Sequence, residues 1–193
     1  MPRARLPDLS LTEWAVLAVT AEQPTHGFAI AKDLASDADL GRIWTVPRPL
    51  VYRALTTLEG HGLVEPLGAE AGDRGPVRTR VRATRAGRSA VDRWLETPVA
   101  HVRQLRTQLL LQLRLLERRT RDTGPLAAAQ LERLVPLLDG LEAQIGAASG
   151  FDRLLLSWRY ESAQAAARVL QRLIDERAGR PGCTPCPPSP RST

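Results

Sequence analysis

One short segment of strict alternation limits the folds open to this chain, because its other patterned segments all have helical spacing. Residues 77–82 read Val-Arg-Thr-Arg-Val-Arg, so arginine stands at every second position. This period of two is typical of a β-strand, and the short apolar run at residues 63–67 gives it a partner. Turn-forming residues lie between the two runs, at 71–76. The sequence therefore predicts a single β-hairpin in a mainly helical protein.

Four helices are expected around this hairpin. Ser10 offers a capping oxygen at the start of the first helix, and Glu13 follows Ser10 at the spacing of a capping box. In the second helix, the spacing predicts that Phe28 and Ile30 point inward. Three helices, a hairpin and a fourth helix make a winged helix-turn-helix domain with a two-stranded wing, which we assign to residues 1–97. The helices are predicted at residues 9–21, 26–35, 47–61 and 84–96.

The third predicted helix has one apolar face and one face suited to DNA. Val51, Ala54 and Leu58 share the apolar side of a helical wheel. A DNA major groove admits one helix, whose exposed side chains then reach base edges. The polar face and its margins give the candidate DNA-binding residues, none of which is acidic, and Glu59 lies farther along the helix. The candidates are Arg48, Pro49, Tyr52, Arg53, Thr56 and Thr57.

Arg53 is the strongest candidate in this set for reading a base. Its planar guanidinium can donate to two acceptors of guanine at once. Tyr52 can donate a hydrogen bond to a phosphate through its hydroxyl group. The alternative interpretation is an ordinary solvated helix face.

Arginines are concentrated in and just after the predicted hairpin. Residues 74–88 contain no acid and hold Arg74, Arg78, Arg80, Arg82, Arg85 and Arg88. Such a set repels itself unless a polyanion neutralises it, and the net charge of +6 also favours an anionic partner. We therefore expect Arg74, Arg78 and Arg80 to contact DNA phosphates. The alternative is a strand edge protected against aggregation by its charges.

The chain from residue 98 onward is predicted to be helical, with helices at 98–119, 126–147 and 151–177. We assign 98–178 to an all-helical C-terminal dimerisation domain and 179–193, rich in Pro, Gly, Ser and Thr, to a disordered tail. Apolar and small residues recur at spacings of three and four in the last helix, which predicts a homodimer interface. Its residues are Leu155, Trp158, Ser162, Ala165, Val169 and Leu173.

This stripe also has a simpler interpretation, as an ordinary core stripe within one chain. Trp158 is in addition a candidate ligand-binding residue, because an aromatic side chain beside small residues can stack on a flat ligand. Its alternative is likewise a place in the core.

Neither catalysis nor a membrane partner is indicated. No apolar run approaches the ~20 residues of a membrane helix, and no secretion signal is apparent, so we expect a cytoplasmic protein. Cys183 and Cys186 have C-x-x-C spacing, but no second Cys or His pair completes four zinc ligands. His26, His61 and His101 also lack metal-binding spacing. We expect no enzyme activity, no catalytic residue, no metal and no cofactor.

Taken together, residues 9–96 resemble the PadR family of transcriptional regulators. The resemblance implies a homodimer that binds a two-fold DNA operator, usually as a repressor, with Tyr52 and its neighbours touching DNA and the wing touching flanking phosphates. Some members of the family release DNA on binding phenolic or other flat aromatic compounds near the dimer interface, which implies a small aromatic effector. The matching segments are His26–Ile30, Gly41, Trp44, Leu50–Leu55, Leu58–Glu59, Gly62–Val64 and Thr84–Arg88.

Two functional hypotheses follow from the sequence. The first is a homodimeric transcriptional regulator that binds double-stranded DNA at a palindromic operator as a repressor. The second is a helical protein-interaction adaptor whose winged-helix domain binds no specific DNA. The two differ in salt dependence, because phosphate contacts release counterions and contacts between proteins do not.

Overall fold

The computed structural model describes residues 7–72 and 75–177, and within these it describes residues 69–72 and 75–78 by their backbone alone. The chain forms two compact units, Met1–Thr123 and Gly124–Thr193. The first unit therefore includes residues 98–123, which the sequence analysis assigned to the C-terminal helical domain. No helix in the described part of the chain is both long and apolar enough to cross a membrane.

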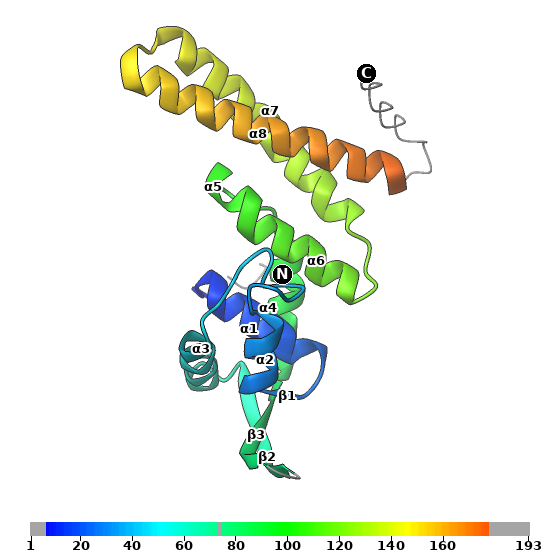
Figure 1. The fold of residues 1–193 in the computed structure, drawn as a ribbon. Helices are drawn as coiled ribbons and strands as arrows, with labels where there is room; N and C mark the ends of the chain where they lie inside the picture. Colours follow the sequence, from blue (N-terminus) through cyan, green and yellow to red (C-terminus); the bar gives the residue numbers. More distant parts are fainter. Residues whose placement is uncertain (1–6, 73–74, 178–193) are drawn as a thin grey trace, which may run out of the picture. The chain divides into compact units, whose positions relative to one another are not determined.

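The first unit contains the predicted winged helix-turn-helix fold, and the protein is mainly helical (Figure 1). The sheet is antiparallel with strand order β1-β3-β2, so it has one strand more than the sequence analysis expected. The strands β2 and β3 extend from the helices as a twisted ribbon, the wing (Figure 1). The elements are α1 (Leu11–Glu22), β1 (Thr25–His26), α2 (Gly27–Asp33), α3 (Arg48–Gly60), β2 (Val64–Gly72), β3 (Gly75–Ala83) and α4 (Arg85–Leu95).

Helix α1 forms the centre of the core. The predicted capping box is present, because the Ser10 amide donates to Glu13 Oε2 at 2.7 Å and Ser10 Oγ accepts from the Glu13 amide at 3.3 Å. Every residue from Trp14 to Thr20 is buried. Trp14 stacks on Trp94 of α4, with the ring centroids 5.1 Å apart and the planes nearly parallel. These contacts hold α1 against α4 and give the wing and α3 a rigid base.

A π-helical segment interrupts the helix predicted at 98–119. The observed order is α5 (Val102–Gln104), the π-helix η1 (Leu105–Leu109) and α6 (Leu110–Arg118). The wider π turn rotates the buried face, so Leu111 and Leu115 are fully buried whereas Leu113 is half-buried. Helix α6 packs on α4 in the first unit, where Gln112 Nε2 donates to the carbonyl of Trp94 at 2.6 Å.

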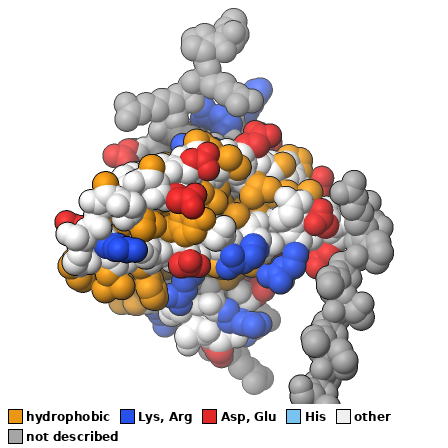
Figure 2. Space-filling view, turned by 90° about the horizontal axis from the view of Figure 1, so that it is seen from above, with side chains coloured by type: hydrophobic (Ala, Val, Ile, Leu, Met, Phe, Trp, Pro, Cys, Tyr) orange, Lys and Arg blue, Asp and Glu red, His pale blue; other side chains and the backbone are white. Residues whose placement is uncertain are grey.

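The second unit is an antiparallel pair of long helices, α7 (Gly124–Ala147) and α8 (Gly150–Arg177). Gly150 adopts φ +57 at the turn between them, a conformation that favours glycine. Leu134 and Leu141 of α7 and Leu170 of α8 are buried between the two helices. Many large apolar side chains of this unit remain exposed, and hydrophobic patches lie between charged groups in Figure 2.

Candidate nucleic-acid interface

Helix α3 presents the polar face that the sequence predicts. Its apolar residues Val51, Ala54 and Leu58 are buried in the core of the first unit, whereas Thr57 is half-buried. Glu59 is the one acid in α3 and lies near its C-terminal end, exposed. The exposed candidate DNA-binding residues of α3 are Arg48, Pro49, Tyr52, Arg53 and Thr56.

The loop before α3 fixes where this helix begins. The Val46 amide donates to the carbonyl of Leu34 at 3.0 Å, and the Val46 side chain is buried. Pro47 follows as the N-cap residue, and Pro49 occupies the first turn, where a missing amide hydrogen costs no helical hydrogen bond. The buried Val46 therefore attaches the start of α3 to the core and fixes the direction in which its exposed face points.

The side chain of Arg48 lies over two aromatic rings. Its guanidinium carbon is 5.1 Å from the centroid of the Phe28 ring and 5.7 Å from that of the Tyr52 ring. Phe28 is 42% exposed, so the prediction that it points inward was wrong. Phe28 lies in the first turn of α2, where it faces α3 rather than the core.

A cavity of about 580 Å³ opens beside this cluster, between α3, the start of α2 and strand β3. Thr79 and Val81 of β3 line it, together with Glu59 of α3. It therefore lies on the side of α3 that faces the wing.

Thr56, Thr57 and Arg53 differ in which donor and acceptor groups remain available for another molecule. Thr56 and Thr57 donate their hydroxyl protons to the carbonyls of Tyr52 and Arg53, at 3.2 and 3.1 Å. Their hydroxyl oxygens are then left to accept hydrogen bonds. The Arg53 side chain makes no ion pair with any residue that the structure describes.

The wing arginines are less free than the sequence suggests. Arg82 Nε donates to Glu65 Oε1 at 2.7 Å, because the two residues are partners across β2 and β3. Arg80 is half-buried, and its Nη2 donates to the carbonyl of Pro24 at 3.4 Å. The expectation that only a polyanion could neutralise these charges overlooked the acids on the facing strand. Glu65 compensates the charge of Arg82, and Arg80 donates to a backbone carbonyl.

Two of the predicted wing contacts have no described side chain. Arg74 lies outside the described residues, and Arg78 is described by its backbone alone, opposite Glu70 in the register of β2 and β3. The assignment of both to phosphate contacts stays a prediction.

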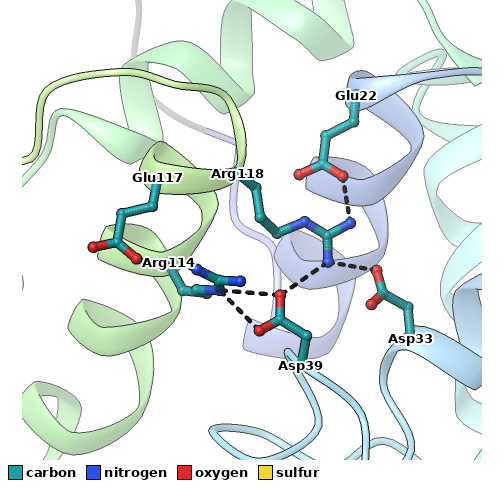
Figure 3. Close-up of polar contacts among 6 residues, drawn as sticks. All are labelled: Glu22, Asp33, Asp39, Arg114, Glu117 and Arg118. Carbon is teal, nitrogen blue, oxygen red and sulfur yellow. Dashed lines mark hydrogen bonds and ion pairs between the residues drawn. The ribbon is translucent and has the colours of Figure 1, made fainter.

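A network of ion pairs joins α6 to the helices of the winged domain (Figure 3). Arg118 Nη2 lies 2.6 Å from Glu22 Oε2 at the end of α1, and its Nη1 lies 2.7 Å from Asp33 Oδ2 at the end of α2. Arg114 Nε donates to both oxygens of Asp39, at 2.8 and 3.0 Å. Asp39 belongs to the loop that leads to α3. The sequence analysis did not find this network, because its partners lie 75 to 96 residues apart.

The same network shifts the pKa values of its arginines. Burial opposes the charge of Arg118, but hydrogen bonds to Glu22 and Asp33 outweigh it and raise the pKa. Hydrogen bonds, first to Asp39 and then to Glu117, raise the pKa of Arg114. Carboxylates of the same unit therefore compensate the positive charges of Arg114 and Arg118.

The predicted dimer and ligand residues lie along α8. Trp158 is 73% exposed, so it is not part of the core of its own unit. Leu155, Ala165 and Val169 are also exposed, whereas Ser162 and Leu173 are half-buried. The adjacent exposed apolar residues Phe151 and Leu154 were not singled out from the sequence.

The described residues hold no group of three or more His, Cys, Asp or Glu side chains that could bind a metal. Cys183 and Cys186 lie outside the described part of the chain.

Residues 16–93 match the model of the transcriptional regulator PadR-like family. This segment is therefore a PadR-like domain. The PadR-like match covers α3 and the wing, and it agrees with the expectation of a regulator rather than an enzyme. No curated protein matches the chain.

Solved structures similar to this chain include two described as PadR proteins. Bacillus subtilis PadR in complex with operator DNA shows 15% identity and a TM-score of 0.45, over 86% of this chain and 99% of that chain. A PadR-like transcriptional regulator from Bacillus cereus shows 17% identity and a TM-score of 0.37, over 88% and 99%. The smu.1604c protein of Streptococcus mutans shows 14% identity and a TM-score of 0.40, over 86% and 98%.

Proposed function

We propose that this PadR-like protein is a homodimeric DNA-binding transcriptional repressor that recognises a palindromic operator. The observation that carries the proposal is the exposed face of α3. Two arginines, a tyrosine and a threonine lie on it, and neither Arg48 nor Arg53 has a carboxylate partner among the described residues. An exposed surface that serves only solubility usually mixes charges of both signs. This face instead suits the acceptor-rich major groove.

The wing adds contacts of a different kind. We expect Arg80, with Arg74 and Arg78, to contact phosphates, which position a protein on DNA without reading its sequence. Because Arg82 is paired with Glu65, we assign it no DNA contact.

Dimerisation is supported by the apolar surface of α8. Leu155, Trp158 and Val169 expose between 45% and 73% of their surface within one chain. An isologous contact would bury the same residues on both copies and would present two α3 helices to two half-sites. A palindromic operator follows from that symmetry.

Trp158 also supports an effector. Its exposed ring lies on the proposed dimer surface, where a small flat aromatic compound could stack on it and release the DNA. A repressor that binds operator DNA would act in the cytoplasm.

The test is a selection of bound duplexes from a random pool by the full-length protein. The proposal predicts enriched palindromes whose half-sites lie about one helical turn, roughly 10 base pairs, apart or a multiple of this distance. Affinity should fall steeply with salt, and sedimentation should show a dimer. A pool that stays random, with association that is insensitive to salt, would contradict the proposal and favour the protein-interaction adaptor.

A further inference from the structure

The two rings that hold Arg48 have little freedom themselves. Phe28 lies in the first turn of α2, which His26 caps by accepting the Ala29 amide on Nδ1 at 3.0 Å. The Tyr52 ring packs directly on Gly27, where an added Cβ would lie 2.7 Å from Tyr52 Cε1. The cluster therefore joins α2 to α3 at the exposed surface.

Both ring centroids lie within the ~6 Å range of a cation–π contact with the Arg48 guanidinium. Such a contact uses the face of the guanidinium and leaves the N–H donors at its edge free. Arg48 is exposed, and its side chain makes no ion pair with the described residues. Arg53, in contrast, has no aromatic ring stacked on it among those residues.

The place of Arg48 along α3 indicates what these donors reach. Arg48 is the first residue of the helix, and the N-terminal residues of a recognition helix contact base edges in the major groove. A planar donor pair in a fixed orientation matches the O6 and N7 acceptors of guanine.

We propose that Arg48 reads a guanine at one position of each operator half-site and that Phe28 is its positioning residue. The proposal rests on the proposed function and names the base that this end of α3 selects. A phosphate contact by Arg48 is the competing outcome, and it has a different signature, because it weakens binding to all sequences alike.

The experiment uses the selected operator and four variants of it, each with one guanine replaced in both half-sites. Full-length wild type, Arg48→Ala, Arg48→Lys, Phe28→Leu and Phe28→Tyr are titrated against each duplex. Arg48→Lys keeps the charge and loses the planar fork. Arg121→Lys, a change to an arginine between α6 and α7 that pairs with Asp92 and Glu96, is the matched control. Unfolding curves confirm that each variant is folded.

Wild type should prefer guanine at one position, and both Arg48 variants should lose roughly 5- to 100-fold of that preference. Phe28→Leu should lose about two- to fivefold, Phe28→Tyr should retain the preference, and the control should match wild type. In the Arg48→Ala background, Phe28→Leu should have no further effect, because its contribution acts through Arg48. A merely structural role of Phe28 would give an additive loss.

If Arg48→Ala keeps the wild-type guanine preference at every position of the half-site, the assignment is overturned and the proposed function is left standing. Uniform weakening across all duplexes with Arg48→Lys equal to wild type would have the same consequence, since this is the signature of a phosphate contact. Additive losses for the pair would overturn the role of Phe28. A wild type that selects no duplex would instead overturn the proposed function, and this inference with it.

Discussion

The arginines of α6 and those of α3 have the same chemistry and opposite surroundings. Arg118 contacts carboxylates at the ends of α1 and α2, and Arg114 grips Asp39 with two hydrogen bonds (Figure 3). Arg48 and Arg53 are exposed and make no ion pair within the described residues. The arginines that pair with carboxylates of the same chain stabilise its fold. Those without such a partner are available to bind another molecule. Arginine count alone could not have distinguished the two sets.

The largest effect is expected from Arg118→Met, which removes the charge and leaves a shorter, unbranched apolar side chain. Glu22 and Asp33 are mostly buried and would lose their shared partner. Removing one member of a fully buried ion pair costs about 3–5 kcal/mol, and the partial exposure here reduces this to roughly 2–3 kcal/mol. Urea denaturation would measure the loss of unfolding free energy.

Operator affinity of the folded fraction should stay close to that of wild type in this variant. An unfolding free energy equal to that of wild type would show that the network contributes nothing to the fold.

Arg53→Ala should show the reverse pattern. We expect a loss of about 1–3 kcal/mol in binding to the selected operator, with relaxed base preference at one position. The unfolding free energy should stay within roughly 0.5 kcal/mol of wild type, because the side chain is exposed and unpaired in the described structure. Titration against operator and scrambled duplexes checks this, and equal losses on both would remove Arg53 from the base-reading set.

Much of this fold could be predicted from local patterns. The capping box at Ser10, the buried face of α3 and the strand predicted from the alternation at residues 77–82 all depend on neighbours within a few residues, and each is present in the structure. The contacts between elements could not be predicted in the same way. Strand β1 forms because Thr25 and His26 pair with residues about 55 positions later. Phe28 contacts Arg48 of α3 instead of the core, a contact between residues 20 positions apart.

The part of the candidate site that depends on local patterns could also be predicted from the sequence. Helical periodicity alone placed Tyr52 and Arg53 on one exposed face. The partner of Arg82 was missed because Glu65 is its neighbour across the sheet and stands outside the acid-free window of the sequence.

Within the wing, Arg80→Ala and Arg82→Ala should separate a phosphate contact from an internal ion pair. Arg80→Ala is expected to weaken operator and scrambled duplexes alike and to reduce the slope of log affinity against log salt by about 1. Arg82→Ala should leave both quantities nearly unchanged. Titrations at several salt concentrations measure the two slopes, and a larger loss for Arg82 than for Arg80 would reverse the assignment.

The smallest effect is expected from Arg114→Ala. The side chains of Arg114 and Asp39 are 40% and 41% exposed. The surrounding water therefore screens their ion pair. An exposed pair contributes about 0–1 kcal/mol to the unfolding free energy, and urea denaturation should show a loss within this range. A loss as large as that of Arg118→Met would mean that the loop before α3 depends on this pair for folding.

The central claim is that the exposed face of α3 is the surface that reads DNA. Its most direct test is the affinity of the Arg48→Ala/Arg53→Ala double variant for the selected operator, measured beside its unfolding free energy. We predict that specific binding falls to the level of a scrambled duplex while the fold keeps wild-type stability. Operator binding equal to that of wild type in this variant would contradict the account.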